Sequence, residues 1–332
     1  MRILITGGSG FIGTNLIEFY LSKGIQVSNI DMKMPRNKDH KSYWEKIDVR
    51  DLQKLKLSVF NFKPDYVIHL AARADLTGKT LQDYSSNIQG VKNIMSVCNE
   101  VDSIKKVVFF STQLVCKCGY YPKDYYDFCP PNLYGESKVI GEKLIQEASS
   151  SLRYKWVIIR PTSIWGPWFG PTYRRFFQLI LNRTYFNFTG KMALKTYGYV
   201  GNTVYQINAL LEEGNTHGKV FYVGDYEPTD IKEWATEIAN EINYSIRSLP
   251  RLMIWCFAKM GDFLGFFNVR FPMTTYRYMN MTTNNIIPLE ETKQYAPDTV
   301  YNRIEGNRLT IKWMNDFYRC NNNTIQAGES FS

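Results

Sequence analysis

The chain has 332 residues, of which 44% are hydrophobic and 21% are charged, a composition that excludes a disordered or low-complexity protein. Its net charge of +9 comes from Lys and Arg residues that are scattered along the chain and are not interleaved with aromatic residues. This distribution argues against a nucleic-acid-binding protein. The six cysteines show no zinc or redox spacing, and a strand pattern at the start leaves no room for a signal peptide. We therefore expect no metal site, reduced thiols and a cytoplasmic location.

Strand and helix patterns alternate along the first half of the chain. Strands are expected at residues 3–5, 26–31, 66–70, 107–110 and 156–159, and helices at 11–22, 52–60, 89–99 and 134–148. The predicted strands are apolar at successive positions and do not alternate between apolar and polar residues. Helices should therefore cover both faces of a parallel sheet. The sequence predicts an α/β fold of the Rossmann type, a doubly wound parallel sheet with a smaller C-terminal lobe.

A change of pattern after Pro161 marks this second lobe. Residues 165–171 are rich in Trp, Gly and Pro, which is typical of a loop that leaves the sheet. A strand at 219–224 should return to the sheet, and a helix is expected at 229–242. The expected division is a Rossmann domain at 1–165 to which the chain returns near 195–228, a second lobe formed mainly by 166–319, and a flexible tail at 320–332.

Residues 251–267 are strongly apolar, although Lys259 and Asp262 interrupt them. The segment is shorter than the roughly 20 residues that a transmembrane helix requires. We expect a packed helix or lid of the second lobe, with a dimer contact or a contact with the membrane surface as alternatives. Stable insertion into a membrane is not expected.

The residues after the first strand carry a phosphate-binding pattern. Gly7, Gly10 and Gly13 follow the strand and open the first helix, and Phe11 and Ile12 lie between the last two. Close backbone approach there lets amide groups bind a pyrophosphate at the positive end of the helix. A strand before the glycines and a helix after them favour a dinucleotide site over a simple turn.

Asp31 ends the second strand, 18 positions beyond Gly13. A carboxylate there can accept hydrogen bonds from the adenosine ribose and repel a 2′-phosphate, which favours NAD over NADP. Lys33 and Arg36 lie nearby and keep NADP as an alternative.

Tyr134 and Lys138 are four residues apart, so their side chains share one face of the predicted helix. An ammonium group lowers the pKa of a neighbouring phenol, so Tyr134 could act as a base near neutral pH. Thr112 lies at the carboxyl edge of a strand and could hold the substrate oxygen. A surface Tyr/Lys pair and a turn cap are the alternatives without a catalytic role. His69, in an apolar strand, is expected to pack near the cofactor rather than to act in catalysis.

Together these motifs resemble the NAD-dependent epimerase/dehydratase family of extended short-chain dehydrogenases. The matching residues follow one order through much of the chain. They are the glycine motif, Asp31, residues 48–51, residues 69–72, Asn87, Gly90, Asn93, residues 111–112, Tyr134, Lys138 and residues 160–161. The resemblance implies a catalytic set and a cofactor-binding set. The catalytic residues would be Thr112, Tyr134 and Lys138, and the cofactor residues would also include Asp48, Val49, Leu70, Ala71, Ala72 and Asn87.

The resemblance also implies that the second lobe binds a nucleotide sugar. Lys195 stands where family members often carry an Arg, and we expect it to contact a phosphate. Arg174 and Arg175 are further candidates for holding the diphosphate, with a solvated helix face as the alternative. Ser163 stands where many members have an Asn that touches the substrate, and Asn202 replaces an acidic residue.

The leading hypothesis is an NAD-dependent nucleotide-sugar epimerase, in which Tyr134 removes a hydroxyl proton and NAD accepts a hydride transiently. An NAD(P)H-dependent keto reductase or dehydrogenase and an inactive NAD-binding regulator are the alternatives. Elimination of water is not expected, because Gln113 and Leu114 stand where related 4,6-dehydratases carry an acid and base pair. The resemblance further implies a homodimer formed through helices 89–99 and 134–148.

Overall fold

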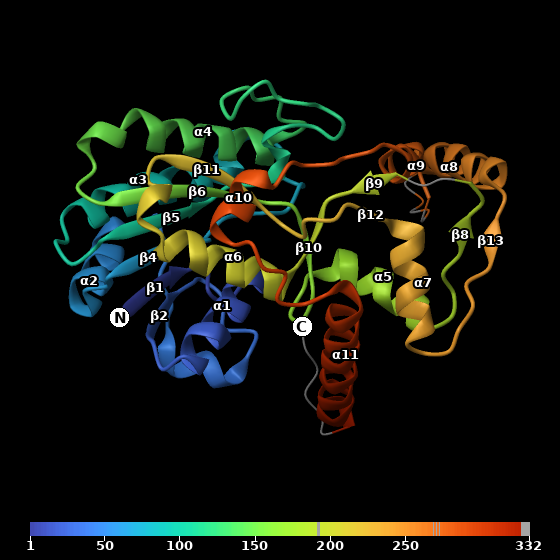
Figure 1. Cartoon of the computed structure of the whole chain (residues 1–332), viewed down its shortest axis with the longest axis horizontal. Helices are drawn as coiled ribbons and strands as arrows, with labels where there is room; N and C mark the ends of the chain where they lie inside the picture. Colours follow the sequence, from blue (N-terminus) through green and yellow to red (C-terminus); the bar gives the residue numbers. More distant parts are fainter. Residues whose placement is uncertain (191–192, 268, 270, 272, 327–332) are drawn as a thin grey trace.

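The computed structural model describes residues 1–190, 193–267, 269, 271 and 273–326, and its first lobe is built on a parallel sheet (Figure 1). The seven strands follow the order β11-β6-β5-β4-β1-β2-β3, and all neighbours are parallel. Their bounds are β1 (Arg2–Thr6), β2 (Gln26–Ile30), β3 (Trp44–Glu45), β4 (Tyr66–His69), β5 (Lys106–Phe110), β6 (Lys155–Pro161) and β11 (Lys219–Val223). The order reverses beside β1, where the carboxyl ends of β1 and β4 open the crevice that binds ligands in such folds.

Helices cover both faces of this sheet. Successive strand residues point to opposite sides, so Ile3 and Ile5 belong to one apolar cluster and Leu4 belongs to the other. The first cluster includes residues of α1 (Phe11–Ser22) and α6 (Val200–Glu212), and the second includes residues of α2 (Leu52–Phe62), α3 (Ser85–Asn99) and α4 (Leu133–Glu147). The predicted doubly wound α/β fold is confirmed.

Polar residues set the starts of several helices. The Asn132 side chain accepts a hydrogen bond from the Gly135 amide at 2.9 Å, and Asp51 accepts one from the Lys54 amide at 3.2 Å. Such caps satisfy amide groups that lack a partner in the first helical turn. The cap at Asn132 matters for the site, because it fixes the first turn of α4, where Tyr134 lies.

The second lobe consists of short helices and two-stranded pairs. Its helices are α5 (Pro171–Leu181), α7 (Ile231–Asn240), α8 (Arg251–Gly265) and α9 (Thr275–Thr282), and α10 (Glu290–Tyr295) and α11 (Arg303–Gln326) follow them in the chain. The strand pairs are β7 (Ser163–Trp165) with β10 (Tyr197–Tyr199), β8 (Asn187–Phe188) with β13 (Ser248–Leu249), and β9 (Leu194–Lys195) with β12 (Thr229–Asp230). The chain returns to the first lobe through α6 and β11, and α11 extends past residue 320, where the sequence predicts a flexible tail.

Helix α8 occupies the apolar segment that the sequence predicts as a packed helix or lid. Of its residues only Ile254, Ala258 and Gly261 are buried, on one stripe of the helix. Asp262 and Leu264 are partly buried, and the remaining residues are exposed. Within the described part of the chain, no helix is long and apolar enough to cross a membrane.

Candidate active site and cofactor site

The glycine loop between β1 and α1 is shaped for close approach of a ligand. Gly7 has a φ of +75°, and a Cβ atom there would lie 2.6 Å from the Ala71 amide nitrogen. A Cβ at Gly10, in contrast, would meet only the Gly7 carbonyl oxygen, at 3.0 Å, so the loop is open on its other side. No side chain caps the start of α1. The loop therefore fits a pyrophosphate held by main-chain amides at the positive end of the helix.

Phe11, Ile12 and Gly13 begin the helix beside this loop. Phe11 and Ile12 are partly buried against the core, and the ring centroids of Phe11 and Phe169 are 6.4 Å apart. The Asn15 amide donates to the Pro167 carbonyl at 3.0 Å. These contacts fasten the glycine loop to the segment that leads into the second lobe.

Asp31 lies directly after β2 and is hydrogen bonded to the glycine loop. Its carboxylate accepts from the Ser9 amide at 3.1 Å and from the Lys33 amide at 2.8 Å. Burial raises the pKa of this carboxyl, and these amides oppose the rise. Burial lowers the pKa of Arg36, and the charge of the neighbouring Asp31 opposes that shift. The Arg36 guanidinium donates to the Trp168 carbonyl. The cation is thus held beside the carboxylate that is predicted to bind the ribose.

The segment after β4 forms the other wall of the crevice. The Leu70 amide donates to the Thr6 carbonyl at 2.9 Å, and the Ala71 amide donates to the Thr6 hydroxyl at 3.3 Å. Thr6 also shares a 2.6 Å hydrogen bond with Nδ1 of His69. Burial lowers the pKa of His69 to about 3, so the ring is neutral at physiological pH. Residues 70–72 therefore lie against the glycine loop, and the structure gives His69 a packing and hydrogen-bonding position.

Asn87 is fully buried, and its amide is used inside the protein. Its oxygen accepts from the Arg73 amide at 2.8 Å, and its nitrogen donates to the Arg73 carbonyl and to the Ser137 hydroxyl at 3.0 and 2.9 Å. These bonds join the loop after β4 to α4. The geometry favours a positioning role for Asn87 over direct contact with a cofactor.

Asp48 and Val49 lie after β3, near the start of α2. The Asp48 carboxylate is bound by the Arg50 guanidinium, with a 2.6 Å contact to Nη2. The Val49 carbonyl accepts from the Asn93 amide at 2.9 Å, and the Val49 side chain lies against Gly90. Val49 is therefore held against α3, and Asp48 is held by its neighbour Arg50.

Thr112, Tyr134 and Lys138 lie near one another at the carboxyl edge of the sheet. Thr112 caps a short 3₁₀ helix (Gln113–Val115), where its hydroxyl accepts from the Leu114 amide at 3.2 Å. Tyr134 lies beside Thr112 in the first turn of α4, and Lys138 follows one turn along the helix. Burial raises the pKa of Tyr134, and the neighbouring Thr112 hydroxyl opposes this rise. Burial also lowers the pKa of Lys138 to about 8, and the charge of Glu142 opposes that shift.

A buried ion pair braces α4 against the sheet. Arg160 on β6 makes a two-point contact with the Glu142 carboxylate, from Nε at 2.9 Å and from Nη2 at 2.7 Å. The guanidinium also donates to the Tyr222 hydroxyl at 3.1 Å and to the Tyr125 carbonyl at 2.7 Å. Since Tyr125 and Tyr222 line the neighbouring cavity, Arg160 connects the helix of Tyr134 and Lys138 to the cavity wall.

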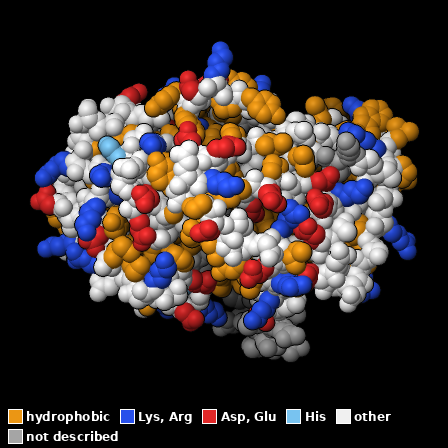
Figure 2. Space-filling model, viewed as in Figure 1, with side chains coloured by type: hydrophobic (Ala, Val, Ile, Leu, Met, Phe, Trp, Pro, Cys, Tyr) orange, Lys and Arg blue, Asp and Glu red, His pale blue; other side chains and the backbone are white. Residues whose placement is uncertain are grey.

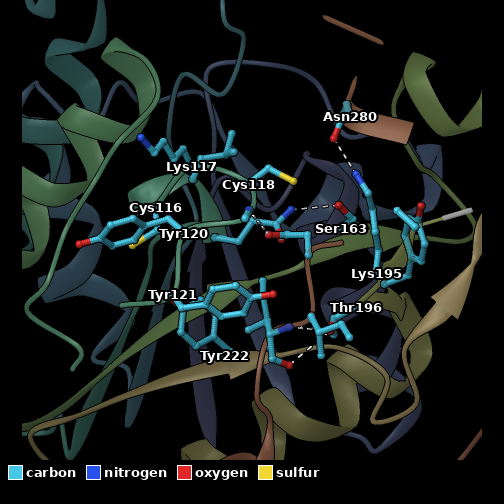
Figure 3. A pocket seen from close by; sticks show the side chains of 18 of the residues that line it. Cys116, Lys117, Cys118, Tyr120, Tyr121, Ser163, Lys195, Thr196, Tyr222 and Asn280 are labelled. Atoms are coloured by element: carbon cyan, nitrogen blue, oxygen red, sulfur yellow. Dashed lines mark hydrogen bonds between the residues drawn. The ribbon is translucent and has the colours of Figure 1, made fainter. Parts of the chain in front are cut away.

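This cavity of about 710 Å³ lies between the lobes and is the candidate substrate site (Figure 3). Its lining comes from the segment after Thr112, from α5, from the strands β7, β9 and β10, and from α9 and the residues that follow it. Two predicted residues lie in it. Lys195 donates to the Asn280 side chain at 2.6 Å, and the Ser163 hydroxyl accepts from the Gln113 amide at 2.9 Å. Burial lowers the pKa of Lys195.

Other sequence candidates lie outside the cavity lining. Arg174 is placed over the Phe317 ring, 5.6 Å from its centroid, and Arg175 is exposed, whereas Tyr173 and Phe176 of the same helix line the cavity. The helical period explains the difference, because it turns the two arginines away when the aromatic residues face inward.

Asn202 is buried, and its side-chain nitrogen is used in hydrogen bonds inside the protein. It donates to the Asp225 carboxylate at 2.8 Å and to the Tyr301 carbonyl at 2.9 Å. Burial raises the pKa of Asp225 to about 6. The acidic group of this region is therefore Asp225, which the sequence patterns do not identify.

Comparisons with known proteins bear on the family and the fold of the chain. The model of the NAD dependent epimerase/dehydratase family matches residues 3–224. The chain is 24% identical over 271 residues to a 3-beta-hydroxysteroid dehydrogenase of Mycolicibacterium neoaurum, covering 76% of this chain and 72% of the relative. It is 27% identical over 257 residues to N-acetyl-alpha-D-glucosaminyl-diphospho-ditrans,octacis-undecaprenol 4-epimerase of Escherichia coli O157:H7, covering 75% and 74%. The crystal structure of a Thermotoga maritima UDP-glucose 4-epimerase with UDP-glucose has a similar fold, with a TM-score of 0.74, 19% identity, and coverage of 96% of this chain and 100% of that one.

Proposed function

The chain belongs to the NAD-dependent epimerase/dehydratase family, and on that premise we propose that it epimerises a sugar of a sugar nucleotide by transient oxidation of one carbinol carbon. The observation that carries this proposal is the arrangement of Thr112 beside Tyr134, with Lys138 one turn along α4 and Lys195 in the adjoining cavity. An oxidation site and a cationic substrate site thus adjoin. The proposal includes a cytoplasmic homodimer formed through α3 and α4.

NAD is the cofactor of this family, and the open glycine loop and Asp31 fit it. When bound, it supplies a hydride acceptor that can return the same hydride. Gly7, Gly10 and Gly13 would hold the pyrophosphate, and Asp31 would hold the adenosine ribose.

The protein side of the reaction is a proton transfer at one oxygen. Thr112 orients the sugar hydroxyl, and Tyr134 removes its proton as the carbinol is oxidised. The Lys138 ammonium stabilises the tyrosinate, which burial alone disfavours. Tyr134 then returns the proton when the ketone is reduced. Inversion requires the keto sugar to present its other face, for which the cavity of about 710 Å³ gives room.

Lys195 is proposed to bind a phosphate of the substrate diphosphate. Its cation is half-buried in the cavity and is oriented by the Asn280 side chain. Ser163, held by Gln113, is proposed to contact the sugar or the nucleotide. Arg174 and Arg175 are not part of this proposal.

We also propose that the enzyme does not eliminate water. Gln113 and Leu114 follow Thr112, and neither side chain carries a titratable proton. The Gln113 amide is hydrogen bonded to Ser163 and, at 3.4 Å, to Asn285. This position therefore supports the cavity wall and lacks the acid that loss of a hydroxyl group requires.

A polyprenol in place of the nucleotide is a second candidate for the substrate's carrier. The Escherichia coli relative is named for such a substrate. The observation that favours this candidate here is the exposed apolar surface of α8, which packs with α9, the helix that carries the cavity residue Asn280.

The experiment combines the bound nucleotide with the product. Purified protein is denatured and the released nucleotide is quantified, and native protein is incubated with UDP-, GDP-, CDP- and dTDP-hexoses. We expect about one NAD(H) per chain, retained through purification, and one sugar inverted at a single carbon. Protein that is purified without bound nucleotide, and that exchanges NAD(P)H with solution while it makes or reduces a keto sugar, would support the reductase or dehydrogenase instead. The feature that favours this alternative is the cation of Arg36 beside Asp31.

A further inference from the structure

An exposed apolar surface covers α8 and the residues after it. We call this surface the α8 face; its members are Leu252, Met253, Trp255, Phe257, Met260, Phe263, Phe266, Phe267 and Val269. Their exposed fractions run from 37% for Phe257 to 87% for Phe266. Figure 2 shows hydrophobic side chains gathered with basic ones at the upper right, over α8 and α9. A surface of this kind usually marks a binding site.

The packing of α8 leaves this face uncovered. Ile254, Ala258 and Gly261 are its buried residues, spaced four and three apart on one stripe. A Cβ atom at Gly261 would lie 1.8 Å from the Met273 carbonyl oxygen, so the following segment crosses the helix there in direct contact. The helix uses this narrow stripe to join its own lobe, and the larger aromatic side chains point elsewhere.

Most charged residues of the chain segment that carries the α8 face are basic. Residues 245–283 contain five Lys or Arg and a single acidic residue, Asp262. Asp262 accepts a hydrogen bond from the Thr275 amide at 3.0 Å, which uses it within the lobe. Lys259 lies over the Trp255 ring, 5.7 Å from its centroid, and Arg251 donates to the Tyr278 hydroxyl at 2.9 Å. Cations therefore lie among the exposed aromatic side chains.

We propose that the α8 face binds the surface of a lipid bilayer that contains anionic lipids. Aromatic and long apolar side chains enter the boundary between headgroups and acyl chains, and Lys or Arg beside them are attracted to lipid phosphates. The contact is peripheral, because the helix is too short to span. It goes beyond the proposed activity, since docking requires neither NAD nor turnover.

A second copy of the chain fits this face less well. A two-fold interface brings the same patch of both subunits together, so the basic residues around Lys259 would meet their own copies. Like charges at an interface disfavour association. An anionic bilayer complements the same charges.

Docking would place the substrate cavity beside the bilayer. Helix α9 packs on α8, and Asn280 and Met281 of α9 line the cavity. A substrate could then reach the site from the membrane surface.

The test is flotation of the full-length protein with vesicles. We expect binding to phosphatidylcholine vesicles that contain phosphatidylglycerol, weaker binding to phosphatidylcholine alone, and loss of the difference at high salt. The triple variant Phe263→Ser, Phe266→Ser, Phe267→Ser should lower the partition coefficient at least about tenfold. Lys259→Glu should lower it about fivefold or more. The control Leu57→Ser changes a 64% exposed residue on α2 and should bind like the unchanged protein.

Thermal unfolding of each variant verifies the fold, which these exposed positions should leave intact. Absence of vesicle binding by the unchanged protein, or equal binding by the triple variant, would overturn the proposal. If the unchanged protein does not bind vesicles and the triple variant changes from dimer to monomer in light scattering, the α8 face is instead an interface between two copies of the chain.

Discussion

Replacing Glu142 by Gln probes the ion pair that connects the catalytic helix to the cavity wall. The Glu142 and Arg160 side chains are 2% and 1% exposed, so the change leaves a guanidinium buried without its carboxylate. Removing one partner of such a pair destabilises a protein by about 3–5 kcal/mol. Native proteins have total stabilities of about 5–15 kcal/mol, so the Tm should fall by roughly 10 °C while the chain still folds.

The same variant should change the pH dependence of catalysis. The Glu142 charge raises the pKa of Lys138, which burial holds at about 8. Lys138 supports Tyr134 only as a cation, so kcat/KM should decrease as the pH rises through about 8 in the unchanged protein. In Glu142→Gln this decrease should begin at lower pH, because the pKa of Lys138 is no longer raised by the carboxylate.

The assay is urea unfolding together with a pH profile of kcat/KM. Glu147→Gln, at an exposed position on the same helix, is the matched control and should change neither quantity. Glu142→Gln combined with Arg160→Met removes both charges and should recover part of the lost stability. A stability loss below about 1 kcal/mol together with an unshifted pH profile would refute the reasoning.

Four further outcomes are expected. Tyr134→Phe should keep NAD binding in calorimetry but lose at least about a hundredfold in turnover, and wild-type turnover would end its assignment as the acid/base. Gly10→Val should abolish NAD binding without unfolding the sheet, since its side chain enters the space of the pyrophosphate, and unchanged affinity in a folded variant would remove the cofactor from this loop. Asp31→Asn should narrow the preference for NAD over NADP, and equal binding of both by the unchanged protein would contradict the role of the carboxylate. Lys195→Met should raise KM about tenfold or more with a smaller change in kcat, because it removes a phosphate contact made in both ground and transition states, and an unchanged KM would exclude that contact.

The sequence predicts the first lobe well because its signals are local. The apolar strands, the glycine loop and the Tyr134/Lys138 spacing can each be recognised from residues that are close together in the sequence. In the structure the glycine loop, Tyr134 and Lys138 lie at the carboxyl edge of the sheet. Helix boundaries differ most at α3, which begins at Ser85 instead of residue 89. A short 3₁₀ helix (Leu81–Tyr84) leads directly into α3. The helical backbone therefore begins before the periodic pattern of apolar residues from which the helix is predicted.

The cavity wall could not be predicted in the same way because it depends on contacts between distant segments. Gln113 and Asn285 are 172 positions apart, and Lys195 and Asn280 are 85 apart. Residue type alone also does not show which of the diphosphate candidates line the cavity. An arginine can bind phosphate at many positions in a protein. Only the fold shows that Arg174 lies over the Phe317 ring and outside the cavity lining.

Product analysis with nucleotide hexoses deuterated at every sugar carbon tests the central claim most directly. The claim is that one hydride leaves a carbinol carbon and returns to it. Mass spectrometry and NMR of the product should show an unchanged mass, every deuterium retained, and inversion at one carbon. A product lighter by one water, formed at a catalytic rate, or a keto sugar that has passed one deuterium to NAD permanently, would contradict the account.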